Sequence, residues 1–95
     1  MLNRHANQLL ARLERVEDVG CAEIRKGELL TWYDRERMTK SVWRDVLQKW
    51  EEVSDTKLLI GDSEGVWVLV YGKGMSTSQT SWLRDARELA DLAAA

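Results

Sequence analysis

Proline and phenylalanine are absent from this chain of 95 residues, and cysteine and histidine each occur once. The single cysteine, Cys21, excludes an intrachain disulfide and fits a reducing, cytoplasmic setting. With His5 as the only histidine, the chain does not assemble the usual ligand set of a zinc site. No apolar run approaches the roughly 20 residues of a membrane-spanning helix. We therefore expect a protein without a disulfide, a metal or a membrane association.

The composition is that of one folded domain over residues 1–95. Hydrophobic residues make up 44% of the chain and charged residues 32%, which excludes a disordered or fibrous protein. The net charge of −2 does not draw the molecule as a whole towards nucleic acid or anionic lipid.

The sequence contains no recognisable catalytic motif. His5 lies beside the apolar stripe of a predicted helix, where a role at the surface or in an interface is the better interpretation. Cys21 opens a predicted strand, where a cysteine packs as a small hydrophobic residue. The segment Gly72-Lys73-Gly74 resembles a phosphate-binding loop, but Lys73 precedes a glycine and not the Ser or Thr of the P-loop. The sequence predicts no enzyme and no cofactor.

Residues 9–34 and 46–72 align as two copies of one unit. Glu14 then meets Glu51, and Gly27 meets Gly65. Each copy is predicted to run from an amphipathic helix through an acidic turn into a glycine-centred hairpin. A repeat of this kind marks a supersecondary unit that buries its apolar face against a neighbour.

The expected order is α-ββ-α-ββ-α, an α+β fold with a four-stranded antiparallel sheet and three helices. Apolar residues at helical spacing predict a helix over residues 2–16, ended by Gly20, and another over residues 42–53, capped by Asp34 or Thr39. Two strands are expected around Lys26-Gly27, with a helix over residues 28–38 as the alternative. A second hairpin turns at residues 62–65. The last helix is expected to bury Trp82, Ala86, Leu89 and Ala90 and to begin at Thr77 or Ser78.

The strand over residues 66–71 has two apolar sides, with valines on one and Trp67, Leu69 and Tyr71 on the other. Such a strand is expected to be central and covered on both faces. Small helices on one face would leave Trp67, Leu69 and Tyr71, or their equivalents, exposed, unless a helix crosses over or a second chain covers them. We expect a second chain, in the simplest case a homodimer that associates through the aromatic face of the sheet or the adjoining helix. The expected core residues are Leu9, Leu13, Val46, Trp50, Ile60, Val68, Val70 and Leu89.

Aromatic and arginine side chains mark the expected partner surface. They gather where the first hairpin runs into the second helix, and on the aromatic side of the strand over residues 66–71. These residue types dominate binding hot spots. In the alternative interpretation, Trp32 and Trp43 fill the core. The candidate partner-binding residues are Trp32, Tyr33, Arg35, Arg37, Trp43, Trp67 and Tyr71.

Two further interpretations concern other classes of partner. Residues 25–49 hold seven basic and four acidic residues. Together with the helix-then-hairpin order, this also fits a winged-helix DNA-binding protein, with residues 39–53 as the recognition helix and 57–72 as the wing. Asp45 and Glu36 interrupt the basic patch, and nucleic-acid-binding domains are normally far more basic. A small inhibitor of a host enzyme, encoded by a mobile element, fits the size and charge equally well.

The opening LLARLERVEDVGCAEIRKGELLTWYD resembles the start of the roadblock/dynein light chain family, with a leucine-rich helix, a short turn and a glycine-containing hairpin. The resemblance implies a non-enzymatic homodimer that regulates a small GTPase or serves as an adaptor. That family has a third strand before its last helix, and residues 73–77 are too few to supply it. The function expected from the sequence is therefore protein binding, in a dimer.

Overall fold

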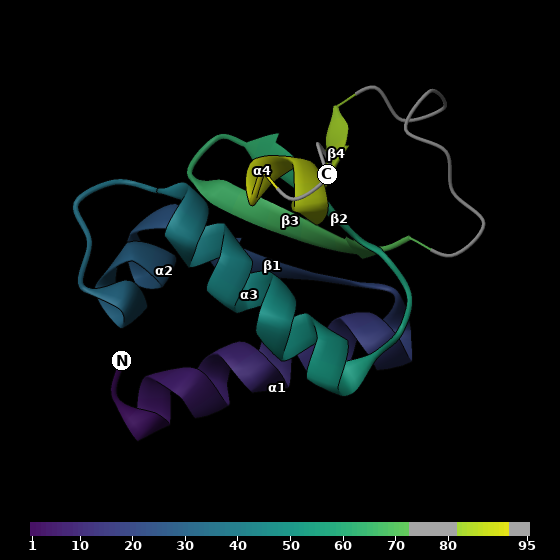
Figure 1. The fold of residues 1–95 in the computed structure, drawn as a ribbon, viewed down its shortest axis with the longest axis horizontal. Coiled ribbons are helices and arrows are strands. Elements are labelled where there is room, and N and C mark those ends of the chain that lie inside the picture. The colour runs from purple at the N-terminus through teal and green to yellow at the C-terminus, as the bar shows by residue number, and fades with distance from the viewer. Residues whose placement is uncertain (73–81, 92–95) are drawn as a thin grey trace.

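The computed structural model describes residues 1–72 and 82–91. These residues form four helices and one four-stranded antiparallel sheet with the strand order β1-β3-β2-β4 (Figure 1). The expected α+β class and sheet are confirmed, with four helices where three were expected. In chain order the elements are α1 (Asn3–Val19), β1 (Cys21–Arg25), α2 (Lys26–Tyr33), α3 (Lys40–Val53), β2 (Leu58–Ser63), β3 (Val66–Tyr71), β4 (Leu83–Asp85) and α4 (Ala86–Leu89).

The two long helices, α1 and α3, follow the apolar periodicity of the sequence. The α1 stripe of Leu9, Leu13 and Val16 is fully buried. Gly20 ends α1 with a φ of 105°, a left-handed conformation that glycine adopts without a steric cost. Thr39 caps α3, because its hydroxyl accepts a hydrogen bond from the Val42 backbone N–H at 3.4 Å. Both helices, the Gly20 end and the Thr39 cap confirm the prediction.

Residues 26–33 form the helix α2, so the strand expected there is wrong. The residues that α2 buries are Leu29 and Trp32, which are three positions apart and therefore lie on one side of a helix. Glu28 stands in the first turn, where a negative charge interacts favourably with the helix dipole. Gly27 does not adopt a positive φ, so it supplies no hairpin turn. The helix ends at Asp34 in a left-handed conformation.

The hairpin of β2 and β3 forms as expected, with Glu64 and Gly65 between the paired residues Ser63 and Val66. Gly65 has a φ of 74°, which the tight turn requires. Strand β3 pairs with β1 on one side and with β2 on the other. Its predicted central position is therefore confirmed.

The C-terminal segment differs from the expected helix. Residues Leu83–Asp85 form β4, which pairs with β2, and α4 spans only Ala86–Leu89. Trp82 precedes β4 and is 52% exposed, so its expected burial is wrong. Ala86 and Ala90 are buried as expected, and Leu89 is half-buried. The expected caps, Thr77 and Ser78, lie outside the described residues.

The two units of the proposed repeat share their first half only. Residues 9–34 fold as helix, strand and helix, whereas residues 46–72 fold as helix, strand and strand. The αββ unit is therefore present in the second copy and not in the first.

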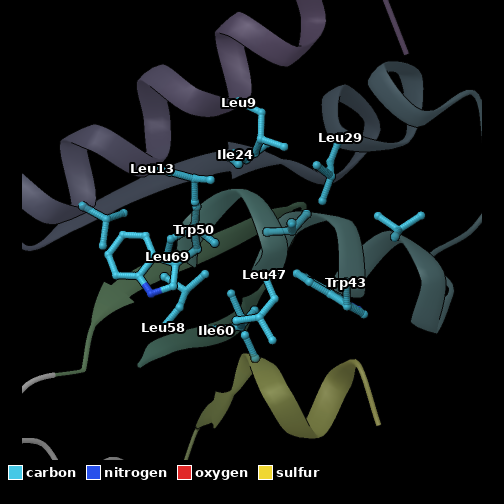
Figure 2. Close-up of a cluster of buried hydrophobic side chains, with 14 of the residues drawn as sticks. Leu9, Leu13, Ile24, Leu29, Trp43, Leu47, Trp50, Leu58, Ile60 and Leu69 are labelled. Carbon is cyan, nitrogen blue, oxygen red and sulfur yellow. The ribbon is translucent and has the colours of Figure 1, made fainter. Parts of the chain in front are cut away.

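One hydrophobic core lies between the sheet and the helices, which all contribute to it (Figures 1 and 2). Figure 2 shows Leu9 and Leu13 of α1 and Leu47 and Trp50 of α3 gathered with side chains of the sheet. Of the eight expected core residues, Leu9, Leu13, Val46, Trp50 and Ile60 are buried. Val68, Val70 and Leu89 are only half-buried. The two valines point to the other face of the sheet, whereas Leu89 of α4 packs at the border of the core.

Candidate interaction surface

The face of the sheet opposite the core carries a row of valines. Val66, Val68 and Val70 are each half-buried, and none belongs to the core cluster that the four described helices share. We call this side the open face. Its residues, in strands β1, β3, β2 and β4, are Cys21, Glu23, Arg25, Val66, Val68, Val70, Leu59, Gly61, Ser63, Leu83 and Asp85.

Strand pairing arranges the open face as an apolar centre with a polar border. Val70 lies between Cys21 and Leu59, and Val68 lies between Glu23 and Gly61. Leu59 and Leu83 are buried outside the core cluster. The three β1 residues of this face, Cys21, Glu23 and Arg25, are exposed. An apolar centre with a charged rim is the usual composition of a protein–protein interface.

Trp82 places a large exposed aromatic side chain on the open face. Its indole ring lies against Gly61, and a Cβ at that position would overlap the ring. A residue other than glycine at position 61 would therefore displace Trp82.

The outer edge of β1 is partly occupied. The Arg12 guanidinium donates a hydrogen bond to the Glu23 carbonyl oxygen at 3.0 Å and forms an ion pair with Glu28 at 3.2 Å. It also lies 5.7 Å from the centre of the Trp32 ring. A long charged side chain on an edge strand discourages pairing with another strand.

The predicted partner residues are divided between the core and the surface. Trp32 and Trp43 are 3% and 5% exposed, which agrees with the alternative in which they fill the core. Trp67 and Tyr71 are half-buried and pack against the core from the helix side. Arg35 and Arg37 are exposed between α2 and α3, and Tyr33 is half-buried beside them.

The ring of Tyr71 lies 6.3 Å from that of Trp50, so the aromatic side of β3 is the side covered by helices. The sequence predicts a partner on this aromatic side, which in the structure packs against the helices. Strand β1 carries the missing signal, because Glu23 and Arg25 alternate with Ala22 and Ile24. The apolar side of β1 is the covered side.

Tyr33 and Asp45 form a polar contact at the border of the helix layer. The Tyr33 hydroxyl donates a hydrogen bond to Asp45 Oδ2 at 2.6 Å, and Lys49 donates to the same oxygen at 2.8 Å. Burial, together with the negative Asp45, raises the pKa of Tyr33. Burial also acts to raise the pKa of Asp45, but the hydrogen bonds from Lys49 and Tyr33 outweigh it and lower that pKa. These groups fix the position of Tyr33.

The basic residues of segment 25–49 are largely engaged within the chain. Lys26 forms an ion pair with Asp62, Lys40 with Asp91 and Lys49 with Asp45. Arg44 donates a hydrogen bond to the Ala90 carbonyl at 3.0 Å. The strands of the supposed wing, residues 57–72, are both internal strands of the sheet. This arrangement argues against the winged-helix alternative.

We searched the described residues for a metal site, a membrane-spanning helix and a reactive cleft. Among residues 1–72 and 82–91, no three His, Cys, Asp or Glu side chains come together as a possible metal site. In the same part of the chain, no helix has the length and apolar character to cross a membrane. A cleft of about 390 Å³ lies where α3 meets β2. Its walls include Glu51, Asp55, Lys57 and Arg87, a mixture of charges without histidine or cysteine.

Comparisons of the chain with protein-family models, with curated proteins and with solved structures found no match.

Proposed function

We propose that this chain is a non-enzymatic, cytoplasmic protein-binding module that works as a homodimer, with the open faces of two copies packed together. The observation that carries the proposal is the row of Val66, Val68 and Val70. It lies on the face of the sheet that is opposite the core shared by the four described helices.

A second copy is the partner that best fits the chemistry of this face. Two sheets commonly pack face to face at about 10 Å, with interdigitating side chains. A twofold axis running across the strands places β1 antiparallel to β1 of the second copy. Glu23 of one copy then lies close to Arg25 of the other, and the pair occurs twice, as a self-complementary interface requires. Valine meets valine at the centre.

The edge of β1 is a weaker alternative for dimerisation. A β1–β1 pairing would have to displace Arg12 from the Glu23 carbonyl and from Glu28. Packing through the open face leaves these contacts intact.

The remaining surface is then available to a further protein. Arg35 and Arg37 are exposed in the connection between α2 and α3. The roadblock/dynein light chain resemblance implies an adaptor or regulator but assigns no residues to that role. In this proposal Arg35 and Arg37 contact the regulated protein, while the valine row holds the dimer together.

Sedimentation equilibrium at micromolar concentration tests the dimer. The wild-type chain should give a mass near twice the monomer mass of 11.0 kDa. Val68→Asp places a charge at the centre of the open face and should give a monomer with unchanged helix content. Gln48→Asp, on the exposed side of α3, is the matched control and should remain dimeric. A monomeric wild type, or a Val68→Asp dimer of normal affinity, would contradict the proposal.

A further inference from the structure

The indole N–H of Trp67 is the one buried side-chain donor or acceptor without a hydrogen-bond partner among the described residues. A buried indole N–H normally finds an acceptor, as Trp50 does with the Thr56 carbonyl oxygen. A buried donor without an acceptor costs about 1–3 kcal/mol. The Trp67 N–H therefore needs an explanation.

Neighbouring side chains hold the Trp67 ring in place. The Trp43 ring packs edge-on against it with the ring centres 5.0 Å apart. The Lys26 ammonium lies over the ring, 4.6 Å from its centre, and pairs with Asp62. The ring is thus held by an aromatic neighbour and by a cation, and rotation in search of an acceptor would break both contacts.

Trp67 also lines a small cavity of about 90 Å³ at the end of the sheet. The other lining residues are Ile60, Asp62, Trp82, Arg84 and Leu89. The lining is apolar at Ile60, Leu89 and the two tryptophans and charged at Asp62 and Arg84. We call this space the Trp67 cavity.

The charges around the Trp67 cavity favour an anion. The negative charge of Asp62 is balanced by its ion pair with Lys26. The remaining charge among the lining residues is the positive charge of Arg84, on the neighbouring strand β4. A carboxylate accepts a charge-assisted hydrogen bond from an N–H, and such bonds are roughly twice as strong as neutral ones. Guanidinium groups bind carboxylates with matching geometry.

The size of the Trp67 cavity limits what enters. Sites for whole small molecules usually have volumes of about 300–1,000 Å³, several times the 90 Å³ found here. The space suits the end of one side chain. We propose that the Trp67 cavity binds the carboxylate of an aspartate or glutamate side chain from a partner protein. The Trp67 N–H and Arg84 act as donors, and Ile60 and Leu89 contact the apolar stem of the ligand.

Ile60, Asp62 and Trp67 lie on the helix side of the sheet, away from the valine row, whereas the Trp82 ring lies against Gly61 of the open face. A single copy contains all the residues of the Trp67 cavity. The Arg84 variant changes only the carboxylate site and the Val68 variant changes only the valine row, so the two proposals are tested independently.

The direct test follows the Trp67 indole resonance of the ¹⁵N-labelled protein by NMR, with Trp67→Phe used to assign it. The probe is N-acetyl-glutamate N-methylamide, whose only charge is the side-chain carboxylate. The expected result is a saturable shift of the Trp67 resonance, with the four other indole resonances shifting much less. The glutamine analogue should bind several-fold more weakly.

Variants at Arg84 keep the test independent of any folding defect in Trp67→Phe. Arg84→Gln should weaken binding of the glutamate probe by about threefold to tenfold, which corresponds to the loss of one partly exposed charged hydrogen bond. Arg87→Gln, on the exposed side of α4 and outside the cavity, should bind normally. No shift of the Trp67 resonance, equal binding of the glutamine analogue, or unchanged binding by Arg84→Gln would each overturn the proposal.

Discussion

Successive side chains of the six-residue strand β3 point to opposite faces of the sheet, and the two faces have different surroundings. Leu69 is 1% exposed, and Trp67 and Tyr71 pack beside it against the helices. Val68 and Val70 point the other way and remain half-buried. The larger side chains face the helices because wide rings fill the space between sheet and helices better than valine does. The smaller residues form a flatter surface, which suits contact with another sheet.

The largest expected effect comes from the covered side. Trp50 of α3 is 1% exposed and faces Tyr71, so Trp50→Ala leaves a large cavity between sheet and helix. We expect the free energy of unfolding to fall by about 3–5 kcal/mol, measured by urea denaturation. A loss below about 1 kcal/mol would show that α3 does not pack on the sheet in this way.

A matched pair of substitutions on β3 compares its sides directly. Leu69→Ala should cost about 2–4 kcal/mol of unfolding free energy, because the covered side cannot collapse around the cavity. Val68→Ala should cost about 1 kcal/mol or less in the monomer. The measurement is urea denaturation at the lowest concentration that tryptophan fluorescence allows. Equal losses for the two variants would mean that the open face is as tightly packed as the helix side.

The Tyr33–Asp45 contact at the border of the helix layer should matter less. Asp45→Asn removes the charged acceptor of Tyr33 and Lys49. Because the site is partly exposed, we expect a loss of about 1 kcal/mol at neutral pH. Glu52→Gln, which changes an exposed carboxylate of the same helix, is the control and should have a smaller effect.

The Asp45 contribution should also depend on pH. The pKa of Asp45 in the folded chain lies below the ordinary value of 3.8, so the folded state holds its proton less tightly than the unfolded state. The stabilisation is therefore complete above about pH 4 and is lost as the pH falls through the folded pKa. Denaturation of wild type and Asp45→Asn across this range should show the two stabilities converging in acid. A constant difference would rule out the ionised contact.

The smallest effect is expected on the outer surface of the helix layer. Lys40 and Asp91 form an exposed ion pair at 2.9 Å, and such pairs contribute little because water and salt screen them. Lys40→Ala should leave the melting temperature unchanged within error. A clear decrease would indicate that the pair anchors α4 to α3.

The sequence predicted the elements whose signals are local and repeated. The stripe of α1, the cap of α3 and the turn at Gly65 each follow from neighbouring residues. The segment of α2 was misassigned because eight residues with leucine and tryptophan suit either a strand or a helix, and the core decides between them. Strand β4 is three residues long and exists because β2 offers it a partner, which no local pattern records.

The candidate surface was also only partly predictable from local sequence patterns. The aromatic residues predicted for partner binding have the composition of a hot spot and also the composition of a core. Burial of Trp32 together with Leu29 depends on α2 being a helix. The Trp67 N–H has no acceptor among residues 1–72 and 82–91, and no spacing of residues in the sequence predicts this.

The position of β1 in the sheet has a consequence for the order of folding. Strand β1 pairs with β3, with Cys21 opposite Val70. During synthesis, α1, β1 and α2 therefore have no strand to pair with until β3 is complete at residue 71. The segment α3–β2–β3 joins neighbours in the chain and closes only short loops. We expect it to form the folding nucleus, with α1 and β1 docking afterwards. Ile60→Val should then slow folding, whereas Ile24→Val should mainly speed unfolding. The reverse result would place the nucleus in the N-terminal half.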